Sequence, residues 1–218
     1  MKLFNLLFKY KVFRYLNYKF NVYLKPLNKL KKLNLKKNSV FIDIGGNRGL
    51  VSNFINDYFN CIIEIYEPHP GCFKILKKKF QNNKKINLYN LAVSNISSKS
   101  KLYLNNESKN EFDITFSASS SLESSKINNS QDKFIEIKTV KIEEVLNNHE
   151  FIDVIKIDIE QHEYKILPSI YSNLNKIGKV IIELHKDEKN NQTNDMYNFW
   201  NNKLKEEGLW GRKFFDWL

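Results

Sequence analysis

Cysteine is scarce in this sequence, which excludes the small folds that depend on a framework of disulfides. Cys61 and Cys72 are the only two thiols, and their spacing matches no such framework. Two isolated thiols suit a reducing compartment, so we expect a cytoplasmic protein. Glycine is also scarce, yet three of the seven glycines, Gly45, Gly46 and Gly49, lie close together.

Long hydrophobic runs are absent as well. No apolar stretch reaches the ~18 to 20 residues of a membrane span. The apolar beginning of the chain is interrupted by Lys9 and Lys11, and no small-residue cleavage site follows it, so we do not expect a signal peptide. A chain of 218 residues with 42% hydrophobic content can bury one core, which predicts one main domain.

Acidic residues are missing from the first 38 positions, and the first acid in the chain is Asp43. Eleven of the 35 basic residues lie in that segment, and the other 24 match the 24 acids in number. A nucleic-acid enzyme is expected to carry basic side chains beside its active cleft. Here the positive charge lies in a leader, so we expect no nucleic-acid partner.

Residues 1–38 are therefore predicted to form a separate basic, aromatic and helical N-terminal segment, followed by the main domain at 39–218. Aromatic residues recur through the leader, and Pro26 interrupts its helical spacing. Residues 1–36 could contact an anionic membrane surface peripherally. They could also pack over the main domain or form a dimer contact, and packing is the reading that we favour. The oligomeric state is left open.

From residue 40 onward, short β-favouring runs alternate with helical patterns. This order predicts an α/β protein of Rossmann-like type, with a mostly parallel central sheet and helices on both faces. Residues 105–132 form a long stretch rich in Ser and Asn, which we expect to be a functional or disordered loop. Strands are expected at about 40–44, 61–66, 86–93, 101–104, 134–140, 153–159 and 179–185, with a closing strand in the tail 208–218. Helices are expected at about 50–59, 71–80, 141–146, 162–174 and 194–207.

A glycine-rich turn joins the first strand to the first helix of this domain. Strand, glycine turn and helix bring a nucleotide-like ligand against bare backbone. Ile44 stands where the dinucleotide pattern has its first glycine, so the spacing fits better an acid-x-G-x-x-x-G loop for S-adenosylmethionine. The alternative is a strand-to-helix turn with incidental glycines.

Acids follow several of the predicted strands. Glu67 ends the second strand, where a carboxylate accepts hydrogen bonds from ribose hydroxyls; an acid at a helix start is the alternative. The run Lys156, Asp158 and Glu160 places three charges on one side of a buried strand, which requires that they pair or meet a polar ligand or a metal.

Glu183 and His185 share one face at another strand end. His185 is a candidate general base, because its reference pKa is near neutral; a structurally satisfied histidine is the alternative. A divalent metal is possible but has no supporting motif, since no fixed ligand spacing is present. Candidate ligands are Asp158, Glu160, His162, Glu183 and His185.

Taken in order, these motifs resemble those of the FkbM-type S-adenosylmethionine-dependent methyltransferases. The resemblance covers about residues 40–185. The matching motifs are Phe-Ile-Asp-Ile-Gly-Gly-Asn-Arg-Gly at 41–49, Tyr-Glu-Pro-His-Pro at 66–70, Asn-Leu-Ala-Val-Ser at 90–94, Ser-Ala-Ser-Ser-Ser-Leu at 117–122 and Val-Ile-Lys-Ile-Asp-Ile-Glu-Gln-His-Glu at 154–163.

The resemblance implies a methyltransferase domain at 39–218 that transfers a methyl group from S-adenosylmethionine to a hydroxyl of a sugar, glycan or glycosylated metabolite by in-line SN2 displacement. It implies that Glu67 binds the ribose, that Ala92 lies near the adenine, and that His185 is a weaker candidate base. The implied cofactor-binding residues are Asp43, Gly45, Gly46, Asn47, Gly49, Glu67 and Ala92. The implied catalytic residues are Asp158, Glu160, His162 and His185.

Two positions depart from the family pattern. Gly46 replaces a common alanine, which we expect to be harmless, and Gln161 replaces a glycine, which puts the local turn in question. A nucleic-acid methyltransferase is a rival reading, although the Asn/Asp-Pro-Pro-Tyr/Phe motif and a Pro-Cys pair are missing. A second rival is a non-catalytic, membrane-associated module with a Rossmann-like fold.

Overall fold

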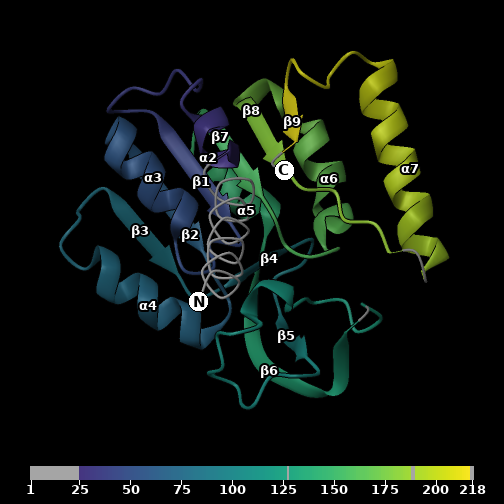
Figure 1. Cartoon of the computed structure of the whole chain (residues 1–218). Coiled ribbons are helices and arrows are strands. Elements are labelled where there is room, and N and C mark those ends of the chain that lie inside the picture. The colour runs from purple at the N-terminus through teal and green to yellow at the C-terminus, as the bar shows by residue number, and fades with distance from the viewer. Residues whose placement is uncertain (1–24, 127, 188–189, 217–218) are drawn as a thin grey trace, which may run out of the picture.

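The computed structural model describes residues 25–126, 128–187 and 190–216, and a parallel central sheet organises them (Figure 1). Its strand order is β3-β2-β1-β7-β8-β9, and all of the neighbouring strands run parallel. The order reverses beside β1, which creates the switch point at which α/β proteins bind ligands. The strands are β1 (Val40–Ile44), β2 (Ile62–Tyr66), β3 (Ile86–Tyr89), β7 (Ile152–Ile157), β8 (Ile177–Ile182) and β9 (Phe214–Asp216).

Helices cover both faces of this sheet because alternate strand residues point to opposite sides. Ile42 and Ile155 pack with α5, α6 and α7, whereas Phe41 and Val154 pack with α2, α3 and α4. The predicted α/β architecture is therefore confirmed, including the closing strand β9 in the tail. The helices are α2 (Lys25–Leu30), α3 (Leu50–Phe59), α4 (Pro70–Phe80), α5 (Ile142–Asn147), α6 (Glu163–Ser172) and α7 (Asn191–Glu206).

A second, three-stranded sheet lies below the carboxyl ends of the central strands in Figure 1. It contains β4 (Ala92–Ser94), β6 (Asn129–Lys141) and β5 (Lys99–Asn105) in that order. Between β5 and β6, the chain forms a serine-rich loop, residues 106–128, with a short 3₁₀ helix, η2 (Ser117–Ser119). This loop lies beside the ends of the central strands.

The structure corrects several predicted element bounds. The single strand expected at 86–93 is two strands in different sheets, because the chain turns away at Asn90, whose amide bonds the carbonyls of Glu67 and Pro68. Strands β7 and β8 end at Ile157 and Ile182, earlier than expected. The acids that follow them therefore lie on loops.

Part of the predicted leader packs against the main domain. Leu27, Leu30 and Leu33 are buried in the same hydrophobic cluster as Phe41 and Ile55. Packing, the favoured alternative, thus holds for the described end of the leader, while residues 1–24 lie outside the described part of the chain. Among the residues that the structure describes, no helix is long and apolar enough to cross a membrane.

Candidate active site

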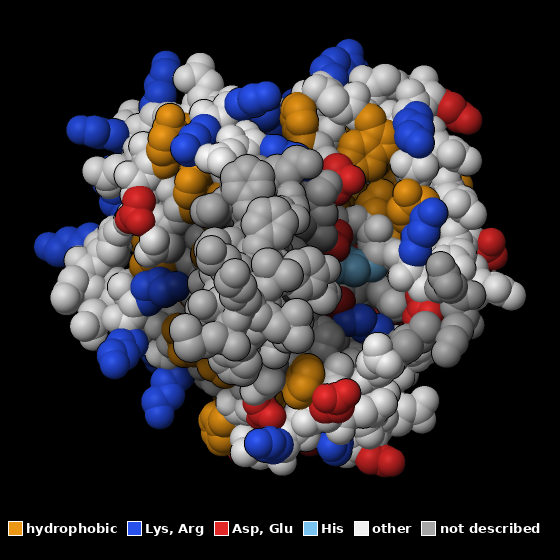
Figure 2. Space-filling model, in the orientation of Figure 1, with side chains coloured by type: hydrophobic (Ala, Val, Ile, Leu, Met, Phe, Trp, Pro, Cys, Tyr) orange, Lys and Arg blue, Asp and Glu red, His pale blue; other side chains and the backbone are white. Residues whose placement is uncertain are grey.

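A cavity of about 410 Å³ opens at the carboxyl ends of β1, β2, β7 and β8. Figure 2 shows a hollow in this face with a histidine among acidic side chains. The glycine turn, the end of β2, the serine-rich loop and the loop after β7 all contribute to its walls. The volume falls within the range of small-molecule sites, roughly 300–1,000 Å³. Residues of the cavity wall include Gly45, Gly46, Asn47, Arg48, Glu67, His69, Ala92, Val93, Leu102, Ser120, Lys156, Asp158, Glu160, His162 and Glu183.

The glycine turn keeps its backbone in the cavity wall because side chains are excluded there. Gly45 has φ +82°, and a Cβ on it would lie 2.0 Å from the carbonyl oxygen of Asp158. The amides of Gly45 and Gly46 both donate to the carbonyl of Tyr66, at 3.0 and 3.2 Å. Only glycine combines this left-handed conformation with so close an approach.

Gly46 and Gly49 leave room for the side chains that pack around the same turn. A Cβ at Gly46 would lie 2.2 Å from Cγ2 of the buried Ile65, and one at Gly49 would lie 2.6 Å from Leu76. Gly46 is thus accommodated, as expected, but an alanine here would collide with Ile65. Gly49, which begins α3 at φ +70°, is not part of the cavity wall.

Glu67 is held by backbone groups at the end of β2. Its two carboxylate oxygens accept hydrogen bonds from the amides of Asn47 and His69, both at 2.7 Å. Burial raises the pKa of Glu67 to about 7, although both hydrogen bonds and the charge of Lys156 lower it. Each oxygen retains a lone pair, so the group can still accept hydrogen bonds from hydroxyls in the cavity.

Ala92 and Val93, at the start of the second sheet, give the cavity an apolar wall beside Glu67. Asn90, just before them, fixes the turn that carries Glu67 through its two side-chain hydrogen bonds. Small apolar residues next to a hydroxyl-binding carboxylate suit a nucleoside, whose base is flat and whose ribose is polar.

Asp43 supports the turn from below and does not line the cavity. It is fully buried, accepts a hydrogen bond from the Ser52 hydroxyl at 2.6 Å and lies 3.3 Å from the Lys156 ammonium. Lys156 also pairs with Asp158 at 3.3 Å and donates to the carbonyl of Gly45 at 3.0 Å. Burial opposes its charge, but the carboxylates of Asp158 and Asp43 raise the pKa of Lys156. Through these contacts the lysine connects β7 to the glycine turn.

The loop after β7, residues 158–163, forms an acidic turn with a left-handed backbone. Glu160 and Gln161 have φ values of +58° and +80°, which explains why the family pattern has glycine at 161. Gln161 preserves the turn, and its buried amide donates to Asp187 at 3.1 Å. Burial raises the pKa of Glu160, whose carboxylate pairs with Lys126 of the serine-rich loop.

His162 holds the serine-rich loop and β4 together. Its Nδ1 lies 2.7 Å from Glu123 and its Nε2 lies 2.9 Å from the hydroxyl of Ser94. The hydrogen bond from His162 lowers the pKa of Glu123 despite its burial. With both ring nitrogens engaged, His162 positions the cavity wall.

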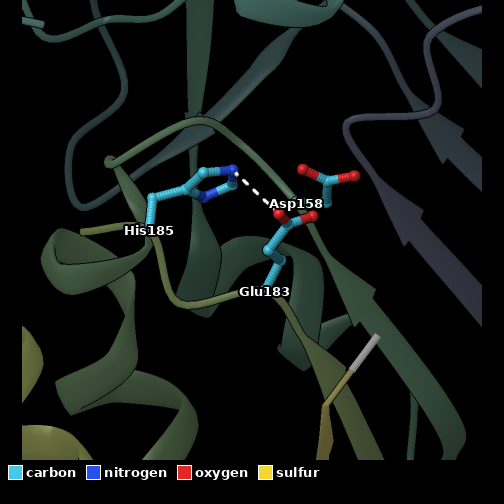
Figure 3. Close-up of side chains that lie close together, drawn as sticks. All are labelled: Asp158, Glu183 and His185. Atoms are coloured by element: carbon cyan, nitrogen blue, oxygen red, sulfur yellow. Dashed lines mark ion pairs between the residues drawn. The ribbon is translucent and has the colours of Figure 1, made fainter. Parts of the chain in front are cut away.

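His185 lies beside Glu183, and Figure 3 marks the ion pair between them. Its Nδ1 is 3.0 Å from the completely buried Glu163, and its Nε2 is 3.4 Å from Glu183 and 3.6 Å from Glu160. Burial lowers the pKa of His185, but the hydrogen bond and charge of Glu163 outweigh it and raise the pKa to about 9. His185 therefore carries a proton at neutral pH. Its side chain does not line the cavity.

Glu183 does line the cavity and lies beside Asp158. Burial, followed by the charge of Asp158, raises the pKa of Glu183 to about 7. Of Glu183 and His185, Glu183 lines the cavity and His185 does not. The sequence put the two side by side but could not show which one reaches the cavity.

Several residues of the site were not predicted from the sequence. Asn90, Ser94 and Glu123 connect the motifs to one another, and Lys126 pairs with Glu160. Asn90 and Ser94 fall inside a matching motif, so that motif was a usable signal. Glu123 and Lys126 come from the irregular loop, where no periodicity indicates which side chains point inward.

The fold and the cavity define the class of protein. A parallel sheet whose order reverses beside β1, a glycine turn after that strand and a carboxylate at the end of β2 are the features of a Rossmann-like methyltransferase. The chain belongs to the methyltransferase FkbM domain family, whose model matches residues 43–208. The resemblance proposed from the sequence motifs is confirmed.

Solved structures resemble the chain only distantly. Precorrin-6y C5,15-methyltransferase of Geobacter metallireducens GS-15 is 13% identical, with 86% of this chain and 71% of that chain covered and a TM-score of 0.46. SMU.1697c of Streptococcus mutans, in complex with SAH, is 12% identical, with 83% and 78% covered and a TM-score of 0.46. P. horikoshii TYW2, in complex with MeSAdo, is 22% identical, with 31% and 26% covered and a TM-score of 0.29.

The chain spans about a quarter to a third of the length of the first three structures that it matches. No curated protein matches it. At these scores the neighbours are too distant to define the site, and the assignment rests on the family match and on the strand order.

Proposed function

We propose that this methyltransferase uses S-adenosylmethionine to methylate a hydroxyl group of a sugar, a glycan or a glycosylated metabolite. The observation that carries the proposal is Glu67, a buried carboxylate held by two backbone amides at the end of β2, beside the glycine turn. S-adenosylmethionine, when bound, supplies the activated methyl group. Glu67 would accept hydrogen bonds from its ribose, Ala92 and Val93 would flank its adenine, and the turn of Gly45 and Gly46 would lie along its methionine portion.

The charge of the cavity supports a neutral, hydroxyl-rich acceptor. Among the described residues that line it, Arg48 and Lys156 are the only arginine and lysine, and Lys156 is already paired with two carboxylates. Glu67 and three further acids line the same space: Asp158, Glu160 and Glu183. Carboxylates accept hydrogen bonds from sugar hydroxyls but repel phosphates, so a sugar fits this wall better than a nucleic acid.

The reaction needs an aligned hydroxyl and somewhere for its proton to go. Asp158, Glu160 and Glu183 would orient the acceptor at the end of the cavity formed by the loops after β7 and β8. Glu183 is better placed than His185 to accept the proton, because it lines the cavity and its pKa is raised to about 7 by burial. His162 and His185 would act through their partners: His162 by positioning the loop and His185 by positioning Glu183.

The proposal is tested by incubating the full chain with S-[methyl-³H]adenosylmethionine and separate sugar, glycan, nucleic-acid and protein fractions. We expect label in a sugar-containing fraction, held through an alkali-stable ether bond. A Glu67→Ala variant should lose the labelling, whereas Glu111→Ala, at an exposed position, should retain it. Label that appears only in nucleic acid or protein, or no binding of S-adenosylmethionine at millimolar concentration, would refute the proposal.

A peripheral contact of residues 1–36 with anionic membranes is a separate part of the proposal. Its support is the sequence, in which that segment has basic and aromatic residues and no acid. Flotation of the full chain with vesicles containing phosphatidylserine should exceed flotation with neutral vesicles. Replacing Lys2, Lys9 and Lys11 by Gln should remove the difference, and equal recovery with both kinds of vesicle would contradict the contact.

A further inference from the structure

A mixed cluster of ligand-type side chains lies at the acceptor end of the cavity. Asp158 follows β7, while Glu183 and His185 follow β8, and Figure 3 shows their polar ends turned toward one another. One ligand atom from each of the three lies within 4.8 Å of the others. Each of the three offers an oxygen or a nitrogen of the kind that binds divalent ions.

The histidine is oriented as a metal ligand would be. Its Nδ1 is bonded to the completely buried Glu163, whose Oε1 also accepts a hydrogen bond from the amide of Ile159 at 2.9 Å. The remaining nitrogen, Nε2, is thereby directed at Glu183. A carboxylate behind the ligating histidine is the usual outer partner in protein metal sites, where it fixes the tautomer and the ring orientation.

The charge around the cluster is unbalanced. Glu163 is completely buried, yet its Oε2 has no hydrogen-bond partner among the described residues. Five carboxylates, those of Asp43, Asp158, Glu160, Glu163 and Glu183, are connected by short contacts to only two lysines, Lys126 and Lys156, and to the imidazole of His185. Buried negative charge of this kind is costly unless a cation compensates it.

We propose that Asp158, Glu183 and His185 bind one divalent cation of the Mn²⁺ type. Two carboxylate oxygens and one imidazole nitrogen form a donor set that such ions accept, and the ion would displace the proton from Nε2 of His185. Three protein ligands leave coordination positions open, and Asp158 and Glu183 both line the cavity. This inference rests on the proposed function in one respect: the open positions would hold the hydroxyl oxygen of the acceptor beside the methyl donor, with Glu183 then acting as a metal ligand in place of the proton acceptor.

Binding of Mn²⁺ alone tests the site without any acceptor. The full chain, stripped with EDTA, is titrated with Mn²⁺ at pH 7.5 in the presence of saturating S-adenosylhomocysteine, and free Mn²⁺ is followed by electron paramagnetic resonance. We expect one ion per chain. Asp158→Asn and His185→Gln should each weaken binding at least tenfold, and the outer Glu163→Gln about tenfold or more.

His149→Gln is the matched control, because His149 pairs with Glu64 at 3.3 Å outside the cavity, and it should leave Mn²⁺ affinity unchanged. Binding of S-adenosylhomocysteine to each variant shows that the variant is folded and that the cofactor half is intact. No Mn²⁺ binding below 1 mM, or equal binding in all variants, overturns the metal site. If S-adenosylhomocysteine still binds, the proposed function survives that result; if it does not, the cofactor assignment fails independently of the metal.

Discussion

Individual residues of the glycine turn and of the acidic turn after β7 are fixed by the space and backbone conformation available to them. Gly45, Gly46 and Gln161 each occupy a position where the neighbouring backbone or side chain decides what fits. The two departures from the family pattern therefore have different physical meanings. Gly46 is matched to Ile65, whereas Gln161 sits in a backbone conformation that glycine adopts more easily.

Gly46→Ala should destabilise the protein by about 1 to 3 kcal/mol, because its Cβ would overlap Ile65 Cγ2 in a packed core. Leucine lacks the β-branch, so in Ile65→Leu that methyl is absent. We expect the double variant to be more stable than the sum of the two single changes implies. Urea denaturation of the four proteins measures this coupling, and additive effects would contradict the proposed collision.

Gln161→Gly and Gln161→Ala both remove the hydrogen bond to Asp187 and differ only at the backbone. At φ +80° we expect the glycine variant to be the more stable of the two by about 1 kcal/mol. At an ordinary helix position, the order would be reversed. Finding alanine more stable at 161 in chemical denaturation would show that the turn is not left-handed in solution.

Glu67 should make the ligand-free protein less stable as the pH rises. Burial raises its pKa to about 7 in the folded state, above the unfolded value of about 4.3. The folded protein therefore holds the proton more tightly, and stability falls between these two pKa values, by about 2 kcal/mol from pH 5 to pH 8.

The measurement is the free energy of unfolding of the wild type and of Glu67→Gln at both pH values. The glutamine variant should lack this part of the decline, so its stability relative to the wild type should rise with pH. Glu111→Gln, at an exposed position, controls for the general effect of losing a carboxylate. An unchanged difference between wild type and Glu67→Gln would contradict the raised pKa.

At the scale of elements, the serine-rich loop is the part of the cavity wall that depends on a few side-chain contacts. Glu123 bonds His162, and Lys126 pairs with Glu160, so the loop is attached to the acidic turn from two positions. Ser121 adds a hydrogen bond to the carbonyl of Glu160 at 2.5 Å. These contacts add to the packing of Leu122 against the apolar cluster of the second sheet and to the backbone hydrogen bonds between Ser121 and Tyr103.

Glu123→Ala and Lys126→Ala should each loosen the loop without unfolding the sheet. A hydrogen bond to a charged group contributes about 1.5 to 3 kcal/mol, so we expect amide exchange in residues 117–126 to accelerate about tenfold or more. Glu111→Ala, in the same loop but exposed, should leave exchange unchanged. Equal exchange in all three variants would show that other contacts hold the loop.

At the scale of the whole molecule, two apolar layers enclose the sheet, and the cavity opens at their edge, where Ile44, Tyr66 and Val51 form part of its wall. A ligand can therefore bind the folded chain without opening its core. A ligand that binds only the folded state raises the free energy of unfolding of the entire chain.

S-adenosylhomocysteine at a hundred times its Kd should stabilise the chain by about 2.7 kcal/mol. For a domain of this size, that corresponds to a rise in Tm of roughly 5 to 10 °C. Differential scanning fluorimetry measures it, with NAD as the comparison ligand that the glycine spacing disfavours. Glu67→Ala should abolish the shift, and a larger shift with NAD would mean that the cofactor has been misassigned.

The sequence by itself determined the order of most strands and helices, the family, and the motifs that meet at the cavity. Glycine spacing and the acid at the end of β2 reflect local backbone geometry, which is encoded in adjacent residues. The tertiary structure alone decided that residues 86–94 divide between two sheets, that Asp43 lies beneath the turn, and that Glu183 rather than His185 faces the cavity. Those outcomes depend on contacts between residues far apart in the chain, such as Asn90 with Glu67 and His185 with Glu163, and no local pattern records them.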